Sequence, residues 1–158
     1  MGYDYLCQYK KDGCSFVKWR CPLKIQGGGV TPSDLAISQC AEISGRYAAI
    51  SQHAGLVPIV EPDVMLDGDH DIEMCQKISE KVLVATFAAL HKHNVLLEGM
   101  LLKTNMVTPG AKCPTRADAA TIAKYTVQCL KRTVPAAMPG IVFLSGGQTE
   151  LGKLKRLD

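Results

Sequence analysis

Five charged residues lie where buried β-strands are expected to end, and together they have the side chains that imine chemistry requires. Lys103 closes a mostly apolar segment, so its amine is expected in partly apolar surroundings near Lys18 and Arg20. Desolvation and nearby positive charge both favour the neutral amine, which is the form that attacks a carbonyl carbon. Glu61 would move protons as the imine forms and breaks down. Asp63, together with Lys18 and Arg20, would position charged groups of a substrate.

A serine and two glycines are candidates for binding a phosphate group. Ser145, Gly146 and Gly147 follow a strand-like segment, and glycine amides beside a hydroxyl can form an anion-binding nest. Taken alone, Ser-Gly-Gly is more typical of a plain turn, and the glycines at 27–29 are interpreted as a flexible loop.

The acidic segment 67–71 superficially resembles a metal cluster, but it is better interpreted as the acidic N-terminus of a helix.

The elements that must position these residues alternate between strands and helices, which predicts an α/β fold built from parallel βαβ units. Strands are expected at 17–25, 56–60, 95–103 and 140–144, and helices at 34–50, 72–93 and 116–132. Active sites in such folds lie at the C-terminal ends of the strands. Pro62 is expected to bend the second strand, and Pro22 is unfavourable inside the first. Polar residues at the four strand ends follow one another at intervals of 42 or 43 positions, which indicates one repeated βα unit: Lys18, Glu61, Lys103 and Ser145.

Composition excludes several classes of protein. With 158 residues, 47% of them hydrophobic, and a net charge of +3, the chain is typical of a globular domain rather than a disordered one. The positive charge forms no stripe, which argues against nucleic acid as a partner. No apolar segment approaches the roughly 20 residues that span a bilayer, so no membrane association is expected. The seven cysteines form no Cys-x-x-Cys pair, which favours free thiols in a reducing compartment and hence the cytoplasm.

Six segments, in this order and spacing, resemble the class I fructose-bisphosphate aldolases. They are KWR at 18–20, VPIVEP at 57–62, DGDHD at 67–71, LEGMLLK at 97–103, NMVTPG at 105–110 and FLSGGQ at 143–148. The resemblance implies a (βα)8 TIM barrel, of which the chain supplies about four consecutive units. A complete barrel typically needs about 250 residues. Residues 1–158 are therefore expected to form the central half of a single barrel domain, and residues 151–158 are a tail that departs from the family.

The resemblance also implies a role for each candidate residue. Lys103 takes the place of the Schiff-base lysine, Glu61 that of the proton-transferring glutamate, and Lys18 that of an active-site lysine. Arg20 would hold one substrate phosphate, and the remaining matches form the loop that binds the other: Ser145, Gly146 and Gly147. Asp63 stands where the family has a second glutamate and is included among the catalytic candidates. No metal ion and no cofactor are implied.

The implied function is that of a lyase of glycolysis. It is the reversible cleavage of fructose 1,6-bisphosphate, a sugar phosphate, into dihydroxyacetone phosphate and glyceraldehyde 3-phosphate. The resemblance further implies a cytoplasmic homotetramer for the full-length chain. Besides the tail, the departures from the family are the shorter Asp63, Thr104 in place of a proline after the Schiff-base lysine, Pro22 within a strand, and two extra residues in the glycine loop around 27–29.

Two alternatives remain open from the sequence. The chain could be a truncated, non-catalytic half-barrel that binds phosphorylated ligands or a protein partner. It could also be a small doubly wound α/β domain. That interpretation leaves unexplained Lys18, Lys103 and the Glu61-Pro62 pair at the end of the second predicted strand. Because four strands do not close a barrel, the isolated chain is expected to self-associate and to have little aldolase activity.

Overall fold

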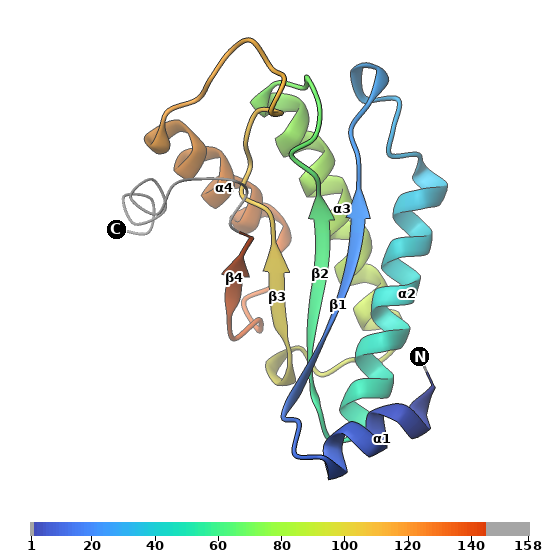
Figure 1. Ribbon diagram of the computed structural model, residues 1–158. Coiled ribbons are helices and arrows are strands. Elements are labelled where there is room, and N and C mark those ends of the chain that lie inside the picture. Colours follow the sequence, from blue (N-terminus) through green and yellow to red (C-terminus); the bar gives the residue numbers. More distant parts are fainter. Residues whose placement is uncertain (1, 145–158) are drawn as a thin grey trace.

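The computed structural model describes residues 2–144, which form one four-stranded parallel sheet with helices packed on it (Figure 1). The strands follow the chain in the order β1-β2-β3-β4. The elements are α1 (Tyr3–Lys11), β1 (Phe16–Leu23), the 3₁₀ turn Gly27–Gly29, α2 (Asp34–His53), β2 (Val57–Val64), α3 (Ile72–Lys92), the 3₁₀ turn Leu97–Gly99, β3 (Leu101–Thr104), α4 (Ala119–Thr133) and β4 (Ile141–Phe143).

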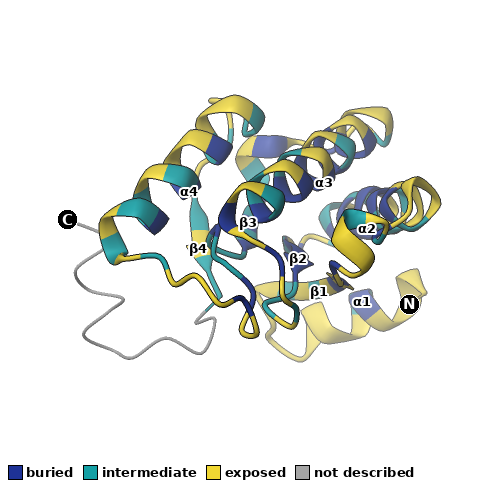
Figure 2. Ribbon diagram, turned by 90° about the horizontal axis from the view of Figure 1, so that it is seen from above, coloured by how far each residue is buried: buried dark blue, intermediate teal, exposed yellow. Residues whose placement is uncertain are grey.

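All three crossover helices, α2, α3 and α4, cover the same face of the sheet, as the view from above shows (Figure 2). A doubly wound domain would carry helices on both faces. Sequential parallel strands with helices on one face are instead the arrangement of consecutive units in a βα barrel. The prediction of an α/β fold made of parallel βαβ units is therefore confirmed, and the doubly wound alternative is wrong.

The core lies between the sheet and these helices. Val60 and Leu102 project from β2 and β3 toward the helices and are completely buried, as are Ala48 of α2 and Leu90 of α3. Burying a leucine side chain in this way stabilises a fold by about 1.5–3 kcal/mol. Because neighbouring residues of a strand face opposite sides, this packing directs the intervening residues to the helix-free face.

Each crossover helix begins at a side chain that caps it. Ser33, Asp71 and Asp118 each accept a hydrogen bond from the backbone N–H three residues on, at 3.2, 2.7 and 2.7 Å. Such caps contribute about 1 kcal/mol each. Asp71 confirms the acidic segment as a helix N-terminus. Within residues 2–144, no three His, Cys, Asp or Glu side chains are arranged to hold a metal ion.

The second strand is longer than predicted. It continues through Pro62 to Val64, and the prediction that Pro62 bends it is wrong. Pairing with β1 persists past the proline, since the N–H of Met65 donates to the carbonyl of Leu23 at 2.8 Å. On the other side, where β3 has ended, the side chain of Asn105 accepts from the N–H of Val64 at 3.0 Å. The Asn105 bond lies on the β3 side, the side on which Pro62 has no N–H to donate.

Other boundaries also differ from the predictions. The third strand begins only at Leu101, because residues 97–99 form a 3₁₀ turn, which the side chain of Gln52 anchors by bonding the N–H and carbonyl of Leu96. The N-terminal helix α1 was not predicted. Pro22 is tolerated within β1, where it is exposed while its neighbours Cys21 and Leu23 are buried.

The regular spacing of the polar residues does not match the strand register. Lys18 pairs with Ile59, whereas the residue opposite Glu61 is Arg20. Lys18 and Glu61 also lie within their strands rather than at the ends. The interval of 42 or 43 residues therefore reflects the length of the repeated βα unit. It does not indicate which residues lie opposite each other on neighbouring strands.

Candidate active site

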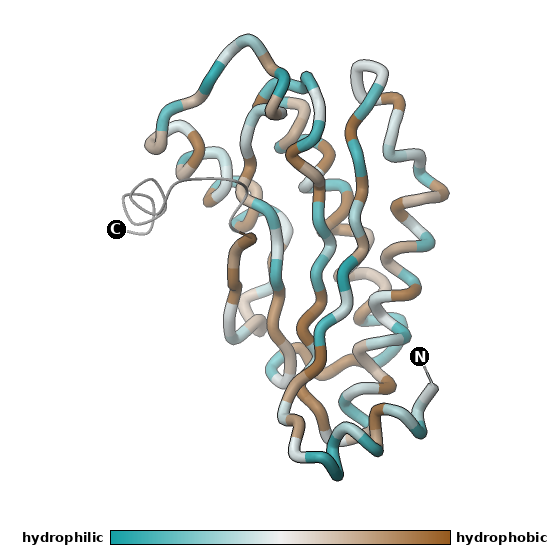
Figure 3. The backbone as a smooth tube through the Cα atoms, in the orientation of Figure 1, coloured by the Kyte–Doolittle hydropathy of each residue, from teal (hydrophilic) through white to brown (hydrophobic). Residues whose placement is uncertain are grey.

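The predicted site residues of the first three strands lie on the helix-free face of the sheet. Lys18 and Arg20 alternate along β1 with Trp19 and Cys21, which face the helices. Hydrophilic residues accordingly interrupt the apolar strands β1 and β2 in Figure 3. Side chains two residues apart on a strand point to the same face, so Lys18 and Arg20 both lie on the helix-free face.

Glu61 is the centre of the cluster. Its side chain is 1% exposed, and its Oε2 lies 3.2 Å from Lys18 Nζ and 3.6 Å from Lys103 Nζ. Arg20 Nε is 3.8 Å from the other carboxylate oxygen. A buried carboxylate of this kind requires compensating charge, and the three cations supply it. No described residue donates a hydrogen bond of good geometry to Oε2, so this oxygen can still accept one from a bound molecule.

Asp63 holds the guanidinium of Arg20. Its Oδ2 accepts from Arg20 Nε at 3.0 Å and from Nη2 at 2.6 Å. This hydrogen bonding, followed by the negative charge of Asp63, raises the pKa of Arg20 above its ordinary value. The Arg20 side chain remains 46% exposed, so its outer N–H groups are available to an anion.

Lys103 lies on β3, between β2 and β4. Its neighbours Leu102 and Thr104 are buried toward the helices, while its own side chain is 30% exposed on the other face. The amine is therefore accessible from the helix-free face and in contact with a buried carboxylate.

The structure brings five of the predicted residues together: Lys18, Arg20, Glu61, Asp63 and Lys103. The remaining three, Ser145, Gly146 and Gly147, lie outside the described residues. Strand β4 ends at Phe143, shortly before them, next to β3.

Asn105 is a site-related residue to which the sequence assigned no role. Besides accepting from Val64, its side chain donates to Ser79 of α3 at 3.2 Å. It thereby connects the segment just after Lys103 to the end of the strand that carries Asp63. The sequence signal was an asparagine two residues beyond the expected nucleophile, within the segment NMVTPG.

Two loops at the C-terminal ends of the strands are locked together. The N–H of Gly110 donates to the carbonyl of His70, and that of Lys112 to the carbonyl of Gly68, both at 2.8 Å. A Cβ at Gly110 would meet the Gly68 carbonyl oxygen at 2.3 Å, so glycine is required for this approach. His70 is buried beneath the loops, and burial lowers its pKa.

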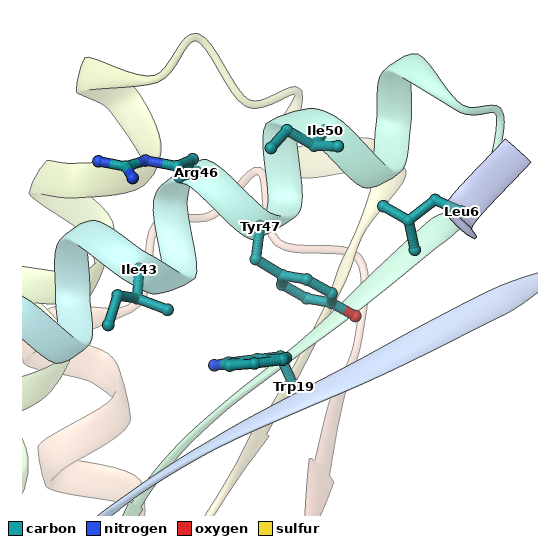
Figure 4. Close-up of a pocket in the computed structure, with 6 residues that line it drawn as sticks. All are labelled: Leu6, Trp19, Ile43, Arg46, Tyr47 and Ile50. Carbon is teal, nitrogen blue, oxygen red and sulfur yellow. The ribbon is translucent and has the colours of Figure 1, made fainter. Parts of the chain in front are cut away.

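An apolar hollow of about 160 Å³ lies between β1 and α2 (Figure 4). Trp19 of β1 and Tyr47 of α2 face each other in it, with ring centroids 5.8 Å apart. Leu6 of α1 closes one end. Because Trp19 points away from Lys18 and Arg20, this hollow belongs to the packing of helix on sheet and not to the site.

The fold is that of a segment of a βα-barrel enzyme, and on its helix-free face a lysine amine contacts a buried carboxylate. The family model for class I fructose-bisphosphate aldolase matches residues 2–158, and the chain belongs to that family. It is 57% identical to fructose-bisphosphate aldolase C of Mus musculus and 58% identical to fructose-bisphosphate aldolase B of Gallus gallus, each over 143 residues. Each alignment covers 90% of this chain and 39% of the relative, so the chain spans about two fifths of their length.

A solved structure agrees with this assignment. Fructose-bisphosphate aldolase from Plasmodium falciparum, crystallised in complex with TRAP and a small-molecule inhibitor, matches with a TM-score of 0.95 and 46% sequence identity. The match covers 98% of this chain and 45% of that one. The predicted family and the prediction of a partial TIM barrel are thereby confirmed. Among the helices of residues 2–144, none is long and apolar enough to cross a membrane.

Proposed function

We propose that residues 1–158 form the central half of a barrel domain which, in the native polypeptide, catalyses the aldolase reaction. Fructose 1,6-bisphosphate would be cleaved reversibly to dihydroxyacetone phosphate and glyceraldehyde 3-phosphate. The observation that carries this proposal is the contact between Lys103 Nζ and the buried, incompletely hydrogen-bonded Glu61, with two further cations beside them. Family membership supports the same reaction.

The proposed chemistry begins with the attack of the Lys103 amine on the ketone carbon of the substrate. The carbonyl oxygen leaves as water, and a protonated imine remains. Its positive charge accepts the electron pair of the carbon–carbon bond as that bond breaks, so the lysine itself is the electron sink and no metal or cofactor is required. Glu61 would carry protons to and from the departing oxygen.

The remaining residues would hold and orient the substrate. Arg20, fixed by Asp63, would bind one phosphate, and Lys18 would neutralise charge that develops near Glu61. Asp63 would act on the substrate through Arg20. Ser145, Gly146 and Gly147 would bind the second phosphate, as expected from the family motif.

Compartment and assembly are further parts of the proposal. The seven cysteines all lie in the described part of the chain and are free thiols, which supports a reducing compartment such as the cytoplasm. The homotetramer and the place in glycolysis are inferred from the family alone.

A second candidate concerns the chain in isolation. In the described sheet, the edges at β1 and β4 pair with no further strand. Open edges of this kind promote association with other chains. We infer that residues 1–158 alone self-associate and lack turnover, as a half-barrel that retains at most phosphate-ester or protein binding. A monodisperse, cleavage-competent monomer in sedimentation and activity assays would refute this inference.

The proposed activity is tested on the native polypeptide by a coupled assay of fructose 1,6-bisphosphate cleavage. Lys103→Met keeps the length of the side chain but removes the amine, and we expect kcat to fall by about 10³-fold or more. Lys77→Met, on the exposed surface of α3, is the matched control and should change kcat by less than about twofold. Turnover by Lys103→Met near the wild-type rate would overturn the assignment.

A further inference from the structure

Two cysteines contact each other across the interface between β1 and α2, which lie side by side in Figure 1. Cys21 projects from β1 onto the helix, and its thiol donates to the carbonyl oxygen of Cys40 at 3.7 Å. The same sulfur lies 3.6 Å from the hydroxyl of Ser44, one turn further along. The Cys40 side chain packs at the same interface, against the buried cluster that includes Leu23 of β1 and Ile37 of α2.

We propose that Cys21 and Cys40 are a site of reversible oxidation, at which a peroxide converts the two thiols into a disulfide joining β1 to α2. Both side chains already project into one interface, so the bond requires a local adjustment rather than a rearrangement of elements. A disulfide here would close the segment that contains the glycine turn 27–29. It would tether the strand that carries Lys18 and Arg20.

The accessibility of the two thiols sets the order of events. Cys21 is 6% exposed, whereas Cys40 is only partly buried and can be reached by a small oxidant. The Cys40 thiolate would attack one oxygen of hydrogen peroxide, so that a sulfur–oxygen bond forms and hydroxide leaves. Cys21 would then attack the resulting sulfenic acid, forming the sulfur–sulfur bond and releasing water. In total, two thiols are oxidised and one peroxide is reduced to two water molecules.

The environment of Cys40 predicts how fast this occurs. Burial and the neighbouring Cys21 raise the pKa of Cys40 to about 11, so little thiolate is present at neutral pH. Because the thiolate is the reactive form, the oxidation rate should rise about tenfold for each pH unit between pH 7 and 9. The site therefore responds slowly to peroxide at neutral pH.

A second pair of cysteines provides the comparison. Cys75 of α3 and Cys129 of α4 are both 2% exposed, and their helices pack against each other. The contacts of the Cys75 thiol include the hydroxyl of Ser79 at 4.0 Å. Because neither thiol is accessible, this pair should resist the oxidation that links Cys21 to Cys40.

The experiment treats the native polypeptide with hydrogen peroxide at pH 7, 8 and 9, alkylates the remaining thiols, and maps the peptides without reduction. We expect a cross-linked peptide pair containing Cys21 and Cys40, its abundance rising with pH and lost after dithiothreitol. The melting temperature of the oxidised protein should rise by a few degrees. In Cys40→Ser the cross-link should be absent.

Wild-type peptide mapping alone decides the question if that variant does not fold. Oxidation of Cys40 to sulfinic acid without a cross-link would overturn the proposal. So would a cross-link between Cys75 and Cys129 that forms at the same rate.

Discussion

Replacing Glu61 with glutamine tests the charge balance of the site, because it preserves the volume of a buried side chain and removes its charge. Three cations lie 3.2, 3.6 and 3.8 Å from the carboxylate. At an effective dielectric constant of about 20, each such pair attracts by about 4–5 kcal/mol. Desolvation of the carboxylate offsets much of this attraction, and the partners are 30–46% exposed, so water screens them further. We expect Glu61→Gln to lower the free energy of unfolding by about 2–4 kcal/mol.

The assay is urea unfolding of the native polypeptide followed by circular dichroism. Glu98→Gln is the matched control, since Glu98 is exposed in the turn before β3, and it should change stability by less than about 0.5 kcal/mol. In a double-mutant cycle, Glu61→Gln and Lys103→Met should couple by about 1–2 kcal/mol. A Glu61→Gln protein as stable as the wild type, or strictly additive effects in the cycle, would refute this account of the cluster.

Two further predictions concern the dependence of stability on pH. Hydrogen bonds from Lys92, and then from His93, lower the pKa of Glu42 below its ordinary value of 4.5. This stabilisation is complete above pH 4.5 and is lost as the pH falls through the lower folded value. Glu42→Gln should therefore flatten the acid side of a melting-temperature profile measured between pH 3 and 6, and an unchanged slope would contradict the pairing. Burial lowers the pKa of His70 below 6.5, so protonation favours the unfolded state and stability declines as the pH falls below 6.5. His70→Gln should remove that decline between pH 7 and 5 in the same measurement, whereas a decline of equal steepness would show that His70 is not its source.

The sequence predicted the α/β class and the composition of the charged cluster for the same physical reason. Side chains along a strand alternate between two faces, so Lys18 and Arg20 must share one, and parallel strands bring that face next to Glu61 and Lys103. Neither conclusion depends on the exact end of an element. Cap residues such as Asp71 were also predictable, because they act on the backbone only three residues away.

What the sequence did not predict depends on contacts between distant segments. The continuation of β2 past Pro62 relies on the side chain of Asn105, some forty residues along the chain. The late start of β3 relies on Gln52 of α2, which holds Leu96 in a turn. Local propensity contains no information about such partners. The register of the strands was misjudged for a related reason, since it is set by packing and not by the length of the repeat.

Reductive trapping shows whether Lys103 forms the proposed covalent intermediate. The native polypeptide is incubated with dihydroxyacetone phosphate and sodium borohydride, digested, and analysed by mass spectrometry. Glycerol 3-phosphate, which has the same phosphate but no carbonyl group, is the matched control ligand. We expect a secondary-amine adduct on Lys103 with dihydroxyacetone phosphate and none with the control. An adduct on a different lysine, or no adduct from an enzyme that still cleaves fructose 1,6-bisphosphate, would contradict it.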